Sequence, residues 1–258
     1  MGILGLMKAI CQVHWLGSQP YQAAWDLQNR LAAEIASGER PPTLLLLEHP
    51  HTYTFGRRGQ PENLLWDEAE RARRGVTLFW VDRGGDVTYH GPGQLVGYPL
   101  LPLAPIQAVA QAAGPPRLPQ QDYVGYLRRL EQVLIQTLAT FGVTAVQIPG
   151  LTGVWVTIPG ETLDKIPAET QDPALAKIAA IGVKVDARGV TRHGFALNVN
   201  TDPAYWQGII GCGLVGHATA NLADVLQPQP DTNELRQALT DAFGRVFGYQ
   251  MVWAALTS

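Results

Sequence analysis

The order of strand-like and helix-like segments is the feature that most limits how this chain can fold. Branched and aromatic runs predict strands at 43–47, 52–55, 76–81, 143–147, 153–157, 177–185 and 195–200. Apolar residues three and four apart predict helices over 21–37, 65–74, 122–141 and 232–247, with a short helix at 203–207. The two kinds of segment do not alternate one for one, as repeated βαβ units require. We therefore expect an α/β protein of the α+β type, with a mixed, largely antiparallel sheet flanked by helices.

The ends of the first helix carry their own signals. Ser18 precedes this helix and can cap its first turn, and Gly38 follows the last apolar position and can end it.

Length and composition indicate the domain organisation. The chain has 258 residues, 46% of them hydrophobic, which suffices for a substantial core. We expect a single domain over 1–258, with surface insertions near 101–120 and 159–173.

Charge, apolar runs and cysteines exclude several classes of protein. A formal net charge of −3 argues against a nucleic-acid binder that relies on phosphate contacts. The longest apolar run, 44–47, is far shorter than the roughly 18 residues that span a bilayer. Two cysteines, Cys11 and Cys212, cannot build a disulfide framework or a four-thiolate zinc site. We expect a reduced, cytoplasmic protein that binds neither membranes nor nucleic acid.

The segment 83–98 is dense in glycine, with five glycines in sixteen positions. Each glycine loses much conformational entropy when the chain folds, and that loss is tolerated where backbone must approach a ligand closely. The segment also contains His90, which taken alone would more often be a structural histidine. No second histidine, cysteine or carboxylate stands at metal-ligand spacing from it, so we expect no metal site.

Cys212 lies between Gly211 and Gly213, a context that suits a nucleophile. A free cysteine is more often a small buried residue, but flanking glycines leave the sulfur unshielded and let N–H groups converge on an acyl oxygen. Such a thiol needs a nearby cation or base to supply thiolate. Lys177, at the start of a strand of small and apolar residues, either extends to solvent or points into a cleft, where it can pass protons near neutral pH. Lys184 is the rival lysine, in a more polar stretch.

The segment 193–200 reads as a strand with small residues on one side. Gly194 and Ala196 lie two positions apart and so share a face, which leaves room for a thin apolar chain such as an acyl tail. Leu197 and Val199 lie on the other face, and we interpret them as core residues.

Together these segments resemble the lipoyl(octanoyl) transferases, also called lipoate-protein ligase B. Residues 83–98 match the family signature Arg-Gly-Gly-X-X-Thr-Tyr-His-X-X-Gly-Gln-X-Val-X-Tyr at every fixed position. Residues 177–182 and 193–200 and the pair 212–213 match the remaining family blocks in order, and the resemblance covers about 44–216. One departure is that Gly211 stands where the family usually has proline before the cysteine.

The resemblance implies the fold shared by biotin protein ligases and lipoate ligases, and a reaction without a cofactor. That reaction moves an octanoyl group from acyl carrier protein to a lysine of a lipoyl domain, in 2-oxoacid dehydrogenases or the glycine cleavage H protein. Cys212 matches the cysteine that carries the acyl thioester, and Lys177 matches the lysine that lowers its pKa. The family's substrate-binding segments correspond to Arg83, Gly84, Gly85, Asp86, Val87, Thr88, Tyr89, His90, Ala180, Ile181, Gly182, Gly194, Phe195 and Ala196.

The small residues in these segments predict a narrow apolar tunnel that ends near Cys212. Its expected lining is Gly85, Ala180, Gly182, Gly194 and Ala196. We expect N–H groups around Cys212 and Gly213 to stabilise the oxyanion, with His90 as a further donor. Two other functions stay open: an ATP-dependent lipoate or biotin ligase, which needs no nucleophilic cysteine, and a non-catalytic binder of carrier proteins.

Overall fold

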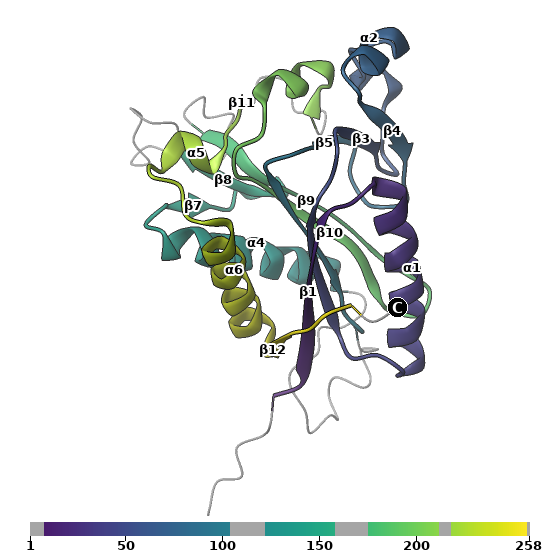
Figure 1. Ribbon diagram of the computed structural model, residues 1–258, viewed down its shortest axis with the longest axis vertical. Helices are drawn as coiled ribbons and strands as arrows, with labels where there is room; N and C mark the ends of the chain where they lie inside the picture. The colour runs from purple at the N-terminus through teal and green to yellow at the C-terminus, as the bar shows by residue number, and fades with distance from the viewer. Residues whose placement is uncertain (1–7, 104–121, 158–174, 212–217, 257–258) are drawn as a thin grey trace, which may run out of the picture.

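The computed structural model describes residues 8–103, 122–157, 175–211 and 218–256, and a large twisted sheet runs through them (Figure 1). Its strands are ordered β12-β1-β2-β6-β10-β9-β8-β7, with β11 beside β9. Their bounds are β1 Ile10–Ser18, β2 Thr43–Glu48, β6 Gln94–Leu100, β7 Ala145–Val146, β8 Val154–Thr157, β9 Leu175–Val185, β10 Thr191–Asn198, β11 Ala218–Thr219 and β12 Gln250–Trp253. The insertions expected near 101–120 and 159–173 lie almost wholly outside the described residues.

Strand directions confirm the expected sheet type. From β2 through β6, β10, β9 and β8 to β7, each strand is antiparallel to the next. β1 is parallel to β2 and β12, and β11 is parallel to β9. The sheet is therefore mixed and largely antiparallel.

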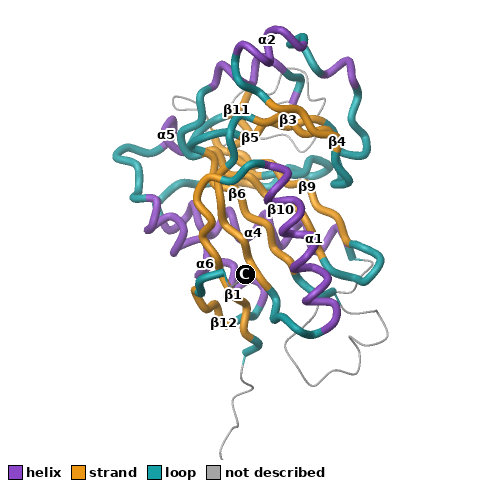
Figure 2. The backbone as a smooth tube through the Cα atoms, turned by 45° about the vertical axis from the view of Figure 1, so that its right-hand side comes forward, coloured by secondary structure: helices purple, strands orange, loops and turns teal. Residues whose placement is uncertain are grey.

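Helices cover both faces of this sheet (Figures 1 and 2). α1 (Tyr21–Ser37) packs on one face, and α4 (Tyr123–Thr140) and α6 (Thr232–Phe247) pack on the other. The run Leu44–Leu47 in β2 shows why a continuous apolar run marks a central strand: alternate leucines face the two helical layers, and all four are fully buried. Each contributes about 1.5–3 kcal/mol by leaving water.

The helix ends correct two expectations. Ser18 is the last residue of β1 and caps nothing; Pro20 occupies the N-cap position of α1, without a side-chain cap. The second helix, α2, covers only Glu68–Arg73 rather than 65–74, because the Asp67 carboxylate accepts a hydrogen bond from Glu70 N at 2.8 Å and starts the helix there. Gly38 ends α1 in the left-handed conformation, as predicted.

A second, three-stranded sheet lies across one end of the main sheet (Figure 2). Its order is β4-β3-β5, with β3 at Thr52–Phe55, β4 at Thr77–Trp80 and β5 at Val87–His90. Short helices complete the described chain: η1 (Pro61–Asn63), η3 (Pro203–Gly208) and α5 (Leu222–Val225). Alternation in β5 sends Val87 and Tyr89 into the core of the small sheet and leaves Thr88 and His90 facing the main sheet.

The central strand β6 was not predicted, because glycine and proline interrupt its sequence. Gly97 has a packing reason, since the ring of Phe195 on the neighbouring β10 lies across it. A β-carbon at Gly97 would stand 2.1 Å from Phe195 Cζ, so only glycine fits. β10 itself begins at Thr191 rather than 195, which brings His193 and Gly194 into the sheet.

Candidate active site

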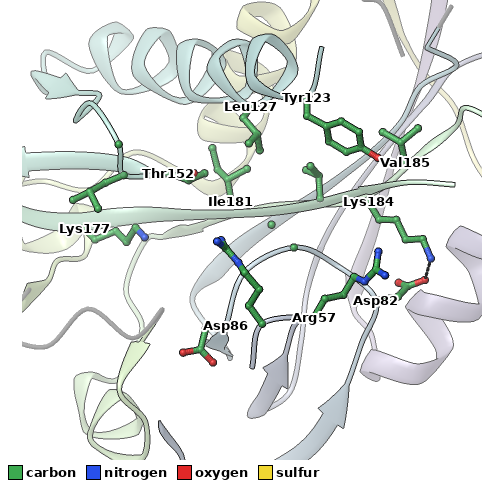
Figure 3. Close-up of a pocket in the computed structure, with 17 residues that line it drawn as sticks. Arg57, Asp82, Asp86, Tyr123, Leu127, Thr152, Lys177, Ile181, Lys184 and Val185 are labelled. Carbon is green, nitrogen blue, oxygen red and sulfur yellow. Dashed lines mark hydrogen bonds and ion pairs between the residues drawn. The ribbon is translucent and has the colours of Figure 1, made fainter. Parts of the chain in front are cut away.

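Two adjoining cavities lie between β9 and the loop 82–86. The larger cleft has a volume of about 630 Å³ and contains Lys177 (Figure 3). The narrower cavity, about 50 Å³, runs between β9, β10 and β5 toward the start of α1. Both cavities are lined by Gly85, Asp86, Ile181 and Gly182, so the cleft continues into the narrow cavity at these residues.

An open edge of β9 forms one wall of the cleft. β8 pairs with β9 only as far as Ala179, so the stretch 180–185 has β10 on one side and no strand of the described chain on the other. The glycine-rich loop contacts this edge, where Gly84 N–H donates to the Val183 carbonyl at 2.9 Å. The exposed strand edge and the loop backbone thus face each other across the cleft.

The pairing of β9 with β8 contains a bulge at Ile178. Val154 is opposite Ala179, whereas the next residue of β8, Trp155, is opposite Lys177. Two steps along β9 therefore correspond to one step along β8, and Ile178 is the extra residue.

This extra residue decides which way Lys177 points. Ile178 and Ala179 are neighbours in sequence, yet both pack into the core beneath α4 and α6. Lys177 consequently lies on the same side of the strand as Ala180 and Gly182, which line the narrow cavity. Strict alternation without a bulge would place the lysine in the core.

The Lys177 side chain contacts an aromatic ring and a glycine. Its ammonium lies 5.2 Å from the centre of the Trp155 ring, a cation–π distance, and Trp155 is fully buried. Its stem also runs against Gly153, whose added β-carbon would stand 2.5 Å from Lys177 Cε. Of the two readings of this lysine, the structure supports the one in which it points into a cleft.

Arg83 anchors the glycine-rich loop from within. Its buried guanidinium donates to the Thr54 carbonyl at 2.5 Å, to Thr54 Oγ1 at 2.9 Å and to the Gly84 carbonyl at 2.9 Å. Gly56 sits against this loop, because a β-carbon there would lie 2.4 Å from the Gly85 oxygen. The close approach of backbone seen at these glycines is between two loops of the protein itself, and the approach to a ligand stays a prediction.

His90 lines the narrow cavity as a neutral ring. Its Nδ1 lies 2.8 Å from Gln94 Oε1, and the Gln94 amide nitrogen donates to the Tyr89 carbonyl and to Asn198 Oδ1. Since those partners fix the amide orientation, Nδ1 carries the proton and Nε2 is an acceptor. Burial lowers the pKa of His90 well below its usual range. His90 in this tautomer cannot donate to an oxyanion through Nε2, which argues against the expected donor role.

Tyr21 and Tyr98 line the narrow cavity, and His49 is hydrogen-bonded to the Tyr98 hydroxyl. His49 Nδ1 donates to the Gln19 carbonyl at 2.7 Å, so its Nε2 accepts the Tyr98 hydroxyl, also at 2.7 Å. Burial lowers the pKa of His49 to about 4. The wall of the narrow cavity thus contains polar groups, at Tyr21, Tyr98 and His90, beside the small and apolar residues of the expected tunnel.

Asp82 holds the far end of the cleft from Lys177 (Figure 3). It accepts from Lys184 at 2.5 Å, from Arg192 at 2.8 Å and from His193 Nε2 at 2.8 Å. The hydrogen bond from His193, with those of the two cations, keeps the pKa of Asp82 well below its usual range. Lys184 is therefore committed to an ion pair that joins the loop to β9 and β10.

The structure brings most of the predicted binding residues together. The narrow cavity is lined by Arg83, Gly85, Asp86, Thr88, His90, Ala180, Ile181, Gly182, Gly194, Phe195 and Ala196. Gly84 lines the larger cleft instead. Val87 and Tyr89 pack in the core of the small sheet, so their side chains do not face either cavity. All five residues of the predicted tunnel are among those that line the narrow cavity.

Cys212 lies outside the described residues, but both flanks of its segment are placed. Ile210 N–H donates to the Asn63 carbonyl at 2.8 Å, next to the small sheet. After the segment, Thr219 pairs with Lys177 in the β11–β9 register. Cys11, the other cysteine, is fully buried in the main core, and burial raises the pKa of its thiol.

Several lining residues were missed from the sequence. Tyr21 and Asp82 lie outside every motif, and His193 begins the block 193–200 but was given no role; the tertiary fold brings all three to the cavities. Arg57 and Arg58 also line the cleft. They lie in the turn after β3, outside every sequence motif.

Two searches of the described chain bear on other kinds of site. Within residues 8–103, 122–157, 175–211 and 218–256, no three histidine, cysteine or acidic side chains gather where a metal ion could be held. Among the helices of the same ranges, none is long and apolar enough to cross a bilayer.

Comparisons with known proteins agree with the resemblance. A model of the lipoyl protein ligase A/B catalytic domain matches residues 20–244. The octanoyltransferase of Chloroflexus aurantiacus is 41% identical over 238 residues, which cover 92% of this chain and 94% of that protein. The octanoyltransferase of Solibacter usitatus is 43% identical over 242 residues, covering 94% and 95%.

Solved structures show the same fold at low identity. A bipartite lipoate protein ligase system from Thermoplasma acidophilum matches with a TM-score of 0.65 and 16% identity, over 97% of this chain and 88% of that one. A lipoate-protein ligase A bound with ATP matches with a TM-score of 0.63 and 18% identity, over 97% and 90%. By its matched catalytic domain and its close relatives, the chain belongs to the lipoyl protein ligase A/B catalytic domain family, and within it to the octanoyltransferases.

Proposed function

We propose that this protein transfers an octanoyl group from acyl carrier protein to a lysine of a lipoyl domain, through a thioester on Cys212. The observation that carries the proposal is that Lys177 and the predicted binding segments, distant in sequence, line one continuous pair of cavities. The octanoyltransferase relatives support the acyl group and the reaction class.

The reaction needs two acyl transfers and no nucleotide. In the first, the Cys212 thiolate attacks the thioester carbonyl carbon of the donor; a C–S bond to Cys212 forms, and the C–S bond to the carrier thiol breaks. The carrier leaves as a thiolate and takes up a proton. In the second, a neutral lysine amine of the acceptor attacks the same carbon, an amide forms, and the Cys212 thiolate is released. Exchanging one thioester for another is nearly balanced, and amide formation drives the sequence.

Lys177 has a part in both steps of this scheme. As an ammonium it stabilises the Cys212 thiolate and can protonate the departing carrier thiolate. As an amine it can then take the proton that the acceptor lysine loses during amide formation. The register pair of Lys177 with Thr219, two residues beyond the segment that contains Cys212, supports placing the two groups together.

The narrow cavity is the proposed place of the acyl chain. Glycine and alanine on β9 and β10, at Ala180, Gly182, Gly194 and Ala196, keep this space open where larger side chains would close it. The wider cleft then holds the reacting carbonyl and the arm of the donor. Arg57 and Arg58, exposed on its rim, suit an acidic carrier protein.

Partners follow from the same scheme. We propose octanoyl-acyl carrier protein as donor, the lipoyl domains of 2-oxoacid dehydrogenases and the glycine cleavage H protein as acceptors, and the cytoplasm as the compartment that contains them. An ATP-dependent ligase is the second candidate, and the observation in its favour is the fold shared with a lipoate-protein ligase that binds ATP.

The test is a covalent adduct. The purified protein is incubated with octanoyl-acyl carrier protein, without ATP, and its intact mass is measured. We expect an increase equal to one octanoyl group, lost in Cys212→Ser and transferred to a lipoyl domain on addition of the acceptor. No adduct without ATP, together with acceptor modification from free octanoate and ATP, would establish a ligase instead.

The choice of lysine is tested separately by alkylation of Cys212. Iodoacetamide labelling is followed against pH in Lys177→Ala and in Lys184→Ala. Loss of the Lys177 ammonium should move the labelling curve to higher pH, by roughly 1–3 pH units if the two groups are in contact. A shift in Lys184→Ala and none in Lys177→Ala would mean that the other lysine activates the thiol.

A further inference from the structure

We infer that Glu131 of α4 is a positioning residue for Lys177, acting through the backbone of Gly153; this rests on the proposed role of Lys177. None of the sequence motifs contains either residue. Glu131 lies within α4, and Gly153 lies in the loop directly before β8, the strand that pairs with the start of β9.

Glu131 is a carboxylate with no exposed surface in the middle of a helix. One of its oxygens accepts the Arg128 guanidinium at 2.6 Å. The other accepts the Gly153 N–H at 2.9 Å. Burying a carboxylate is costly unless it is paired and hydrogen-bonded, and these two contacts, one from α4 and one from the loop before β8, offset that cost. The contact with Gly153 ties the loop before β8 to the helix.

Gly153 is a position where only glycine fits, for two independent reasons. Its φ of +130° is a conformation that other residues rarely adopt. A β-carbon there would stand 2.5 Å from Lys177 Cε, 2.6 Å from the Ala179 carbonyl and 3.3 Å from Lys177 Nζ. The lysine stem therefore lies directly on the glycine backbone.

Trp155 also contacts Lys177. The ammonium lies 5.2 Å from the ring centre, and the lysine stem lies against Gly153. Neither neighbour can move freely, because Trp155 is fully buried and Gly153 is bonded to a buried carboxylate. Glu131 thus acts on the position of the ammonium through Gly153.

The decisive variant is Gly153→Ala, and Gly142→Ala is its matched control. Gly142 follows α4 with a φ of +77°, so alanine is strained there too, but its β-carbon would meet nothing within 4 Å. Gly142→Ala measures the cost of alanine at a positive φ alone, and Gly153→Ala should lose more stability, because its methyl group also meets the Ala179 carbonyl. Only Gly153→Ala should displace Lys177; because a misplacement of about 1 Å can cost 10²-fold in rate, we expect its kcat to fall by roughly 10–10²-fold with little change in KM for the carrier protein.

The pH dependence of Cys212 alkylation separates positioning from general damage. In Gly153→Ala the labelling curve should move toward that of Lys177→Ala, whereas in Gly142→Ala it should stay with the wild type. Glu131→Gln keeps an oxygen that can accept from Gly153 N–H and should shift the curve less than Glu131→Ala does. An unmoved curve in Gly153→Ala overturns the inference.

A double variant tests the inference without relying on how well Glu131 variants fold. If Gly153 acts through the lysine, adding Gly153→Ala to Lys177→Ala should slow transfer no further. If the two losses multiply, Gly153 has a separate structural role and the inference is wrong. Failure of the proposed function looks different, since the wild type would then form no octanoyl adduct; failure of the proposed role of Lys177 would leave labelling and transfer unchanged in Lys177→Ala alone.

Discussion

The neutral state of His49 predicts that the protein loses stability between pH 8 and pH 5. Burial lowers the pKa of His49 to about 4 from an ordinary value of 6.5. Its Nδ1–H donates to the Gln19 carbonyl and its Nε2 accepts from the Tyr98 hydroxyl. A second proton on the ring would make Nε2 a donor that faces the hydroxyl hydrogen of Tyr98. The folded protein therefore resists protonation at this position.

The sign and size follow from proton linkage. Below pH 6.5 the unfolded chain takes up a proton on His49, whereas the folded chain does so only near pH 4. Between these values the unfolded state binds more protons, so the free energy of unfolding falls as the pH falls. From pH 8 to pH 5 the loss from this one residue is about 2 kcal/mol.

Urea unfolding at pH 8 and pH 5, in the wild type and in His49→Gln, measures this loss. The variant should be less stable at pH 8, since it loses one of two buried hydrogen bonds, but its drop on acidification should be smaller by about 2 kcal/mol. The partly exposed His51 provides the control, and His51→Gln should keep most of the wild-type drop. An equal drop in His49→Gln and wild type would refute the neutral, buried assignment.

Three further substitutions test the cavity, the core and the sheet. Ala196→Phe should shift the preference of acyl transfer toward shorter chains, or abolish binding, because Ala196 lines the narrow cavity. Carrier-protein thioesters of graded chain length measure this preference, and an unchanged profile would count against the cavity as the place of the acyl chain. Cys11→Ala should keep acyl transfer near the wild-type rate while lowering stability by about 1 kcal/mol or more, since this thiol is fully buried in the core; a large loss of transfer at intact fold would contradict that. Gly97→Ala should destabilise the protein by about 1–3 kcal/mol in urea unfolding, because its methyl group would overlap the Phe195 ring; unaltered stability would show that β6 and β10 can separate.

Elements that depend on local pattern were predictable from the sequence. α1, α4 and α6 carry apolar stripes, and Gly38 ends α1 as its position predicts. The leucine run of β2 is recognisable because a central strand is apolar on both faces. Sheet type was predicted from the order of these elements, before any strand pairing was known.

Elements that depend on distant partners were not predictable. β6 looks like a loop because the ring that requires Gly97 comes from Phe195, almost a hundred residues later. β1 and β12 lie at opposite ends of the chain and pair with each other, so neither has a nearby turn to mark it. Asp82 joins the glycine-rich loop to Arg192 and His193, and this role cannot be seen in the sequence because the partners lie more than a hundred residues away.

The candidate site divides in the same way. The residue types and their segments were predictable, and most of the predicted binding residues do line one cavity. Their orientation was not, because Val87 and Tyr89 lie in the same strand as Thr88 and His90 but point the other way. That the chain is a single domain and that Cys212 is the nucleophile both stay predictions.

Because of the bulge at Ile178, the direction of Lys177 depends on the number of residues between Lys177 and Ala180, and not only on which residues they are. Substitutions within this interval change a side chain and leave the direction of its neighbours intact. Removing one residue would instead restore regular alternation, turn the ammonium into the apolar layer beneath α4, and remove the Lys177 charge from the cleft. In this part of β9 a deletion of one residue should therefore impair the site more than most substitutions do.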